Sequence, residues 1–267
     1  MSATGRPRAR KRFGQHFLHD RRVVERIIAH FDPRPGERIV EIGPGHGALT
    51  GALLDACGRL DAIELDRDLV SALPGRYLDH GELVVHSADA VDFDFRQLAV
   101  RGTALRIIGN LPYNISTPLI FHLLEQRSVI NDMLFMLQRE VVERMTAGAG
   151  NKTYGRLSVM VQFACEVENL FTVRPGAFQP PPKVDSAIVH LHPRRQLLHE
   201  VDPADLAQVV KQAFAQRRKT LRNTLRDLLP AAAIEAAGID PAQRAEQLGL
   251  DQFAALANAL TARKSTF

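Results

Sequence analysis

Residues 38–50, RIVEIGPGHGALT, decide the fold of this chain. The segment 39–42 is apolar and β-branched apart from one acid, which is typical of a short parallel strand buried on both faces. Gly43, Gly45 and Gly47 follow at alternate positions, so the backbone can take positive φ and approach a ligand closely. Apolar residues then resume at helical spacing. A strand, a glycine turn and a helix in this order predict the first βα unit of a nucleotide-binding α/β sheet.

The glycine loop also indicates the kind of ligand. G-P-G-H-G is one residue shorter than the dinucleotide fingerprint G-x-G-x-x-G, and Glu41 precedes it. The form E-x-G-x-G-x-G resembles the cofactor loop of class I methyltransferases, which use S-adenosylmethionine. That cofactor has no pyrophosphate, so a full phosphate-binding turn is not required. At this point a nicotinamide or flavin enzyme, or a tight turn without a ligand, remains an alternative.

Further apolar runs predict the rest of the sheet. Strands are expected at 60–63, 83–85, 105–108, 133–137 and 187–191. Residues 157–171 form a long apolar stretch that fits either a strand or a buried helix, and its position favours a strand. Helices are expected between the strands, with Asp20, Asp66 and Ser116 as N-caps.

Two acids follow the second and third expected strands. Glu64 lies about twenty positions past the glycines, where dinucleotide enzymes also place an acid to accept hydrogen bonds from ribose hydroxyls. It therefore indicates an adenosine cofactor without choosing between enzyme classes. Asp89 could accept a hydrogen bond from an adenine amino group, and the alternative is a simple turn cap.

The strand at 105–108 runs into Asn110-Leu111-Pro112-Tyr113, the most specific tetrapeptide of the chain. The lone pair of an adenine amino nitrogen is delocalised into the ring, which makes it a poor nucleophile. Hydrogen bonds from its two protons to the Asn110 side-chain oxygen and the Pro112 carbonyl would favour a more reactive, pyramidal nitrogen. Proline fixes φ and helps to aim that carbonyl. Tyr113 would stack on the base and hold it out of its own stack.

A proline-rich segment, Phe178-Gln179-Pro180-Pro181-Pro182-Lys183-Val184-Asp185-Ser186, precedes the last expected strand. Its three prolines predict a rigid, extended presentation. Phe178 is a candidate for a second aromatic face on the target base. A plain proline-rich turn is the alternative.

Composition excludes several classes of protein. With 267 residues and 45% hydrophobic content, the chain can bury a large core. No apolar run is long enough to span a bilayer, and the basic N-terminus lacks the apolar core of a secretion signal. Cys57 and Cys165 match no metal or redox spacing, as expected of a cytoplasmic protein. His190 and His192 have no third ligand nearby, so no metal site is predicted.

The net charge of +4 is unevenly distributed. Residues 1–22 and residues 211–226 each carry a net charge of +6, so the remainder carries −8. Two basic patches on an acidic body predict docking to a polyanion. Residues 1–12 are expected to be a flexible basic arm, 13–195 a cofactor-binding domain, and 202–267 a helical RNA-binding domain joined to it by a polar linker. The candidate RNA-binding residues are Arg10, Lys11, Arg12, Arg217, Arg218, Lys219 and Arg222, and the last four are expected on helices.

Taken together, 13–18, 41–47, 110–113 and 178–186 resemble the ribosomal RNA adenine N6,N6-dimethyltransferases, in particular the bacterial small-subunit (16S) enzymes. The resemblance implies a Rossmann-like class I methyltransferase sheet with a small C-terminal all-α domain. It also implies dimethylation, with S-adenosylmethionine, of two adjacent adenosines in the 3'-terminal hairpin of small-subunit rRNA, on a late assembly intermediate. The protein is expected to be a monomer and to bind neither DNA nor a membrane. The family's cofactor positions correspond here to His16, Leu18, Gly43, Gly45, Glu64, Asp89 and Asn110; many members have Asn where this chain has His16.

Two other functions remain open from the sequence. A large-subunit rRNA methylase of the antibiotic-resistance type shares the form of the tetrapeptide at 110–113, but the segment 178–186 favours the small-subunit enzyme. An assembly factor that mainly occupies immature subunits is the second alternative, and it is compatible with methylation.

Overall fold

The computed structural model describes residues 16–100 and 102–265. The chain divides into two compact units. The sheet unit comprises residues up to 142 together with 168–193, and the helical unit comprises 143–167 together with 194 onward. The expected cofactor-binding domain, 13–195, includes residues 143–167, whereas in the structure these residues belong to the helical unit. The reason lies in the packing: Val159 and Phe163 belong to the apolar cluster formed by the C-terminal helices.

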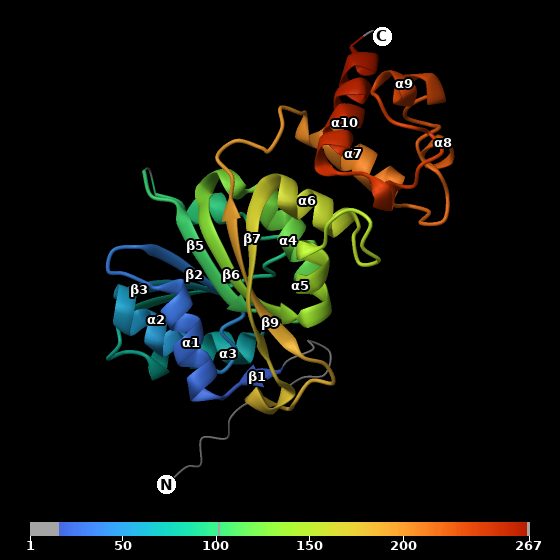
Figure 1. Ribbon diagram of the computed structural model, residues 1–267. Coiled ribbons are helices and arrows are strands. Elements are labelled where there is room, and N and C mark those ends of the chain that lie inside the picture. The colour runs from blue at the N-terminus through green and yellow to red at the C-terminus, as the bar shows by residue number, and fades with distance from the viewer. Residues whose placement is uncertain (1–15, 101, 266–267) are drawn as a thin grey trace. The chain divides into compact units, whose positions relative to one another are not determined.

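A seven-stranded sheet forms the frame of the sheet unit, with the order β4-β3-β2-β5-β6-β9-β7 (Figure 1). The strands from β4 through β6 in this order pair in parallel, and β9 pairs antiparallel with β6. A separate two-stranded ribbon joins β1 to β8. The strands are β1 (Phe17–Leu18), β2 (Arg38–Ile42), β3 (Arg59–Glu64), β4 (Glu82–Ser87), β5 (Leu105–Asn110), β6 (Ile130–Gln138), β7 (Cys165–Val173), β8 (Phe178–Gln179) and β9 (Ser186–Pro193).

The predicted α/β class and the six parallel or antiparallel strands expected from apolar runs are confirmed. The expected strand at 157–171 is wrong in its first half, which is the helix α6 (Arg156–Ala164), followed directly by β7. Six of the nine side chains of α6 are buried and only Arg156 is exposed, so the sequence shows no clear polar face to reveal the helical period. Gly155 donates its N–H to the Ser158 hydroxyl (3.1 Å) and starts this helix.

Helices of the sheet unit pack through apolar side chains onto the strands. They are α1 (Arg21–Phe31), α2 (Thr50–Cys57), α3 (Arg67–Ala72) and α4 (Ser116–Glu125), and α5 (Arg139–Thr146) begins in this unit. Asp20 caps α1 and Asp66 caps α3 as predicted, by accepting from backbone N–H groups. Ser116 is not a cap. It occupies the first position of α4, and its hydroxyl donates to the Tyr113 carbonyl oxygen (3.1 Å).

An ionic cluster anchors α1 to the sheet. Arg106 on β5 donates to both carboxylate oxygens of Asp132 on β6 (2.8 and 3.0 Å) and also binds the Phe31 carbonyl oxygen at the end of α1. His190 on β9 contacts the same carboxylate (2.8 Å). Burial acts to raise the pKa of Asp132, but the hydrogen bonds from His190 and Arg106 outweigh it and hold the pKa at about 2. His190 is thus a structural residue of β9.

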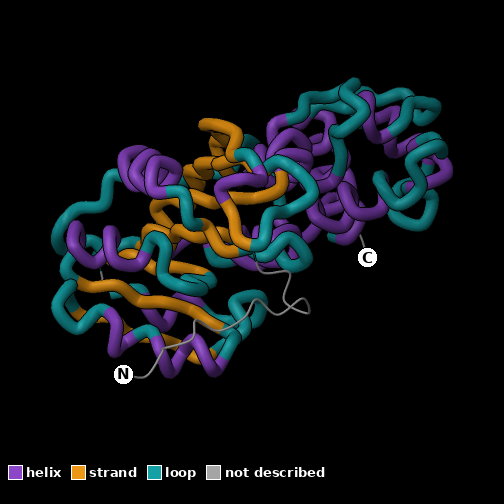
Figure 2. Tube along the Cα trace, turned by 90° about the horizontal axis from the view of Figure 1, so that it is seen from below, coloured by secondary structure: helices purple, strands orange, loops and turns teal. Residues whose placement is uncertain are grey.

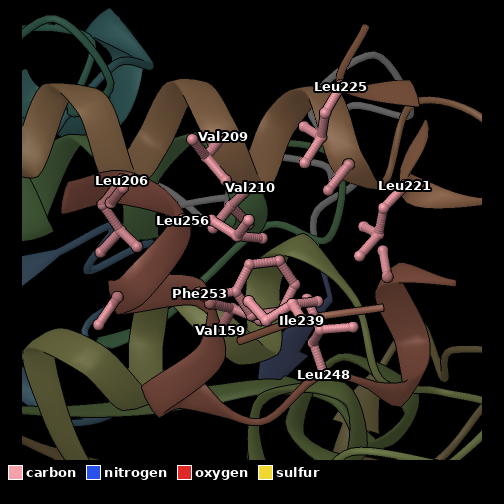
Figure 3. Packing of buried hydrophobic residues seen from close by; sticks show 14 of the residues in the cluster. Val159, Leu206, Val209, Val210, Leu221, Leu225, Ile239, Leu248, Phe253 and Leu256 are labelled. Atoms are coloured by element: carbon pink, nitrogen blue, oxygen red, sulfur yellow. The ribbon is translucent and has the colours of Figure 1, made fainter. Parts of the chain in front are cut away.

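Four helices form most of the helical unit: α7 (Pro203–Ala213), α8 (Leu221–Thr224), α9 (Ala231–Ala236) and α10 (Leu250–Lys264). From α7 onward the chain consists of helices and loops only within the described residues (Figure 2). Side chains from α6, α7, α8 and α10 meet in one apolar cluster, in which Phe253 is fully buried (Figure 3). The buried Asp205 of α7 accepts from Thr261 (2.6 Å) and from Lys264 of α10. None of the helices in the described residues combines the length and the apolar character of a bilayer-spanning segment.

Candidate active site

A cavity of about 270 Å³ lies at the carboxyl ends of the strands β2, β3, β4 and β5. After β2 the chain adds β3 and then β4 on one side of it, and β5 lies on the other side of β2. The cavity therefore opens where the strand order reverses. Open α/β sheets bind their ligands at this switch point. All seven residues predicted to bind the cofactor line the cavity, as do Pro112 and Tyr113.

The glycine loop after β2 has the expected positive φ angles. They are 65° at Gly43, 57° at Gly45 and 81° at Gly47. A Cβ atom at Gly47 would lie 1.9 Å from the Tyr77 hydroxyl oxygen, whose hydrogen is donated to the Gly47 carbonyl (2.8 Å). Tyr77 therefore packs tightly against the loop at Gly47, while Gly43 and Gly45 line the cavity.

Glu64 ends β3 with both carboxylate oxygens fixed by the backbone. It accepts from the N–H of Gly45 (3.2 Å) and from the N–H of Asp66 (2.9 Å). Each carboxylate oxygen has a further lone pair, so the group can still accept hydrogen bonds from ligand hydroxyls. Burial raises the pKa of Glu64.

Asp89 follows β4 and is half-buried at the cavity wall. One of its carboxylate oxygens accepts from the Val91 N–H (3.0 Å). The residue thus caps a turn, which was the alternative prediction, and it also lines the cavity. Its second carboxylate oxygen has no hydrogen-bond partner among the described residues, so it is available to a ligand.

Asn110, at the end of β5, has a defined amide orientation. Its side-chain nitrogen donates to the His16 carbonyl oxygen (2.9 Å). Within the described part of the chain, the amide oxygen Oδ1 has no protein partner. The Pro112 carbonyl accepts one hydrogen bond, from the Ile115 N–H (3.2 Å), and keeps its second lone pair. Two acceptors are therefore available at adjacent positions of the cavity wall, as the amino-group hypothesis requires.

Tyr113 is half-buried beside these acceptors. Its hydroxyl shares a hydrogen bond of 2.7 Å with the hydroxyl of Ser186. The ring of His16 lies 5.5 Å from the tyrosine ring, centroid to centroid, with an interplanar angle of 32°. Burial raises the pKa of the Tyr113 phenol above its ordinary value of 10, so the hydroxyl carries its proton near neutral pH, as an unperturbed phenol does.

Phe178 is the predicted catalytic residue that the structure does not place at the cavity. Its side chain is 2% exposed, belongs to the apolar core, and does not line the cavity. The cause is the register of the two-residue ribbon, which pairs Phe178 with Leu18, so that its ring points inward and Gln179 is exposed. In this structure, the expected second aromatic face is therefore not formed by Phe178.

The predicted RNA-binding residues are placed only in part. Arg10, Lys11 and Arg12 lie outside the described residues. Arg217, Arg218 and Lys219 are exposed, but they occupy the turn between α7 and α8, and only Arg222 is on a helix. The prediction that all four lie on helices is wrong because α7 ends at Ala213. Arg217 pairs with Glu246 (3.3 Å), so it is partly neutralised within the helical unit.

Comparison with known proteins decides the family. The model of the family described as ribosomal RNA adenine dimethylase matches residues 6–262. The chain belongs to this family. It is 58% identical over 250 residues to ribosomal RNA small subunit methyltransferase A of Nitrosococcus oceani, covering 93% of this chain and 95% of the relative. It is 56% identical over 259 residues to the protein of the same description in Pseudomonas putida, covering 95% of each chain.

Two solved structures share the architecture of this rRNA adenine dimethylase. A dimethyladenosine transferase from Plasmodium falciparum is similar with a TM-score of 0.81 and 26% identity, over 93% of this chain and 98% of that one. The 23S rRNA methyltransferase ErmE is similar with a TM-score of 0.69 and 26% identity, over 92% and 99%. These similarities confirm the class I methyltransferase fold and an enzyme that uses S-adenosylmethionine.

Three residues at this site were not among the predicted site residues. Glu41 is 2% exposed on β2, lines the cavity, and accepts from the Thr50 hydroxyl (2.7 Å). Burial raises its pKa to about 7. Leu65 is 49% exposed at the cavity, and Ser186 contacts Tyr113. Glu41 and Ser186 do lie in the motifs at 41–47 and 178–186, and Glu41 is also an acid within a strand that is otherwise apolar, whereas Leu65 has no signal in the sequence.

Proposed function

We propose that the cavity positions S-adenosylmethionine against the N6 amino group of an adenosine in small-subunit rRNA. The substrate is a pair of adjacent adenosines in the 3'-terminal hairpin, each of which receives two methyl groups on a late assembly intermediate. Membership in the rRNA adenine dimethylase family supports the reaction. The small-subunit relatives at 54–58% identity support this rRNA over the large-subunit one.

The residues of the cavity fit the cofactor. The glycines leave the backbone open where side chains would fill the space, and Glu64 presents a carboxylate to hydroxyl groups. Leu65 provides an exposed apolar surface for an adenine ring, and Asp89 can accept from its amino group. The cofactor supplies an activated methyl group, so the chain needs no nucleophilic side chain or metal for the transfer.

The observation that carries the proposal is the orientation of Asn110. Because its amide nitrogen is bound to the His16 carbonyl and the residue lines the cavity, its oxygen is the side-chain atom left to accept from a ligand. Together with the Pro112 carbonyl, it can accept both protons of an adenine amino group, which localises the lone pair on nitrogen. Placing this nitrogen beside the methyl donor supplies most of the acceleration by proximity and orientation.

Several features support the binding of RNA by the helical unit. Arg218, Lys219 and Arg222 are exposed, and within the described chain no ion pair engages them. Cations on a compact helical unit can contact phosphates without reading the sequence. A monomeric, cytoplasmic enzyme that docks onto the immature small subunit is consistent with these patches. Occupancy of immature subunits as an assembly factor would use the same contacts.

Asn110→Ala tests this function. The variant should lose methyl transfer from labelled cofactor to small ribosomal subunits, because one of the two amino-group acceptors is removed. Its affinity for the subunit should stay near that of the unmodified protein, because the RNA contacts lie mainly elsewhere. Asn131→Ala, at the opposite end of the sheet on β6, is the matched control and should methylate normally. Loss of subunit binding along with methylation would contradict the proposed division of roles.

A further inference from the structure

The proline-rich segment is attached to the active site at two points. At its start, the His16 ring nitrogen Nδ1 donates to the Pro180 carbonyl (2.8 Å). At its end, Ser186 shares its hydrogen bond with the Tyr113 hydroxyl. The partners are separated by 164 and 73 residues in sequence, so these are tertiary contacts built by the fold.

Both attachments converge on the ring of Tyr113. The ring of His16, oriented by Pro180, lies against one side of it, and Ser186 fixes its hydroxyl end. The backbone carbonyl of His16 also accepts a hydrogen bond from the side-chain amide of Asn110. The acceptor and the aromatic residue of the catalytic tetrapeptide are therefore held by the same set of contacts.

Ser186 is well suited to restrain a ring. It is 0% exposed, and its backbone is the first position of β9, paired with Gln138 of β6. A buried hydroxyl on a strand that has a neighbouring strand on each side has little freedom to move. The hydrogen bond therefore transmits the rigidity of the sheet to Tyr113, which otherwise lies in a turn between β5 and α4.

We propose that Ser186 is a positioning residue for the methyl transfer, acting through the Tyr113 hydroxyl to hold the ring in the orientation that receives the target base. The proline-rich segment then contributes to catalysis through the hydrogen bond from Ser186 that holds the Tyr113 hydroxyl, and not through the buried ring of Phe178. A ring fixed before binding loses less entropy when the base stacks on it, and the amino group meets its acceptors more often in the reactive geometry. This inference rests on the proposed adenine methylation.

The test compares Ser186→Ala, Tyr113→Phe and the double variant, in single-turnover and steady-state methylation of small ribosomal subunits with labelled cofactor. Each single variant should lower kcat by roughly 3- to 10-fold, the rate equivalent of one neutral hydrogen bond. The double variant should be no slower than the slower single variant, because both substitutions remove the same interaction. The dissociation constant for S-adenosylmethionine, measured by calorimetry, should not change.

Ser158→Ala is the matched control, since Ser158 is equally buried but lies in α6 of the helical unit, and it should leave kcat unchanged. Multiplicative effects in the double variant, an unchanged kcat in Tyr113→Phe, or an equal loss of cofactor affinity would overturn the inference. Tyr113→Phe keeps the test valid if Ser186→Ala does not fold. Failure of the unmodified protein to methylate adenine would refute the proposed function instead, so the two failures are distinguishable.

Discussion

Replacing Glu41 by Gln should remove a pH-dependent loss of stability from this protein. Glu41 is buried on β2, next to the glycine loop, and burial raises the pKa of its carboxyl from 4.5 to about 7, with a smaller contribution from the nearby Glu64. Gln has nearly the same shape and can still accept from the Thr50 hydroxyl. The substitution therefore removes the titration and retains the packing.

The sign follows from the direction of the pKa change. The folded protein binds the Glu41 proton more tightly than the unfolded chain, so the stabilisation is complete below pH 4.5 and is lost as the pH rises through 7. Each tenfold change in proton affinity is worth about 1.4 kcal/mol. Between pH 5 and pH 8, the free energy of unfolding of the unmodified protein should thus fall by roughly 2–3 kcal/mol relative to Glu41→Gln.

Urea unfolding at several pH values measures this difference directly. Other groups titrate in the same range, but they are common to both proteins and cancel in the comparison. Glu25→Gln, on the exposed face of α1, is the control and should follow the unmodified protein at every pH. Parallel stability curves for the unmodified protein and Glu41→Gln from pH 5 to pH 8 would refute the argument.

Three further substitutions test the structure. Gly47→Ala combines positive φ with a clash against the Tyr77 hydroxyl, so it should cost about 1–3 kcal/mol in urea unfolding, whereas Gly75→Ala meets no atom within 4 Å and should be nearly neutral. Asp132→Ala removes one of the two carboxylates that bind Arg106, whose side chain is 13% exposed, while Glu37 keeps its contact (2.6 Å), so the free energy of unfolding should fall by roughly 1.5–3 kcal/mol; a loss near zero would exclude a role for the Arg106–Asp132 pair. Arg222→Gln should reduce the slope of log affinity for small-subunit rRNA against log salt by about 1, and an unchanged slope would remove this residue from the interface.

Much of the fold could be predicted because buried parallel strands appear in the sequence as apolar runs. The residues after those runs, such as Gly43, Glu64 and Asn110, were expected to be neighbours because the carboxyl ends of parallel strands meet at one edge of the sheet. The failure at α6 has the opposite cause. A short helix that is mostly buried has nearly the same composition as a buried strand, so periodicity does not distinguish the two.

The remaining details of the site depend on long-range contacts. The inward direction of Phe178 is set by a register of only two residues with β1, which no local pattern specifies. The bond from Ser186 to Tyr113 and the bond from Asn110 to His16 join segments that are distant in sequence. The basic residues at 217–219 were expected on a helix, but α7 ends before them, and Arg217 in the turn that follows contacts Glu246, which is distant in sequence.

The most direct test is mass spectrometry of small-subunit rRNA after incubation of immature subunits with this protein and isotopically labelled S-adenosylmethionine. The prediction is that two adjacent adenosines in the 3'-terminal hairpin each gain two labelled methyl groups on N6, and that Asn110→Ala leaves both unmodified. Label on another base, on another position of adenine, or undiminished in the Asn110→Ala sample would contradict the assignment of Asn110 as the acceptor that activates the amino group.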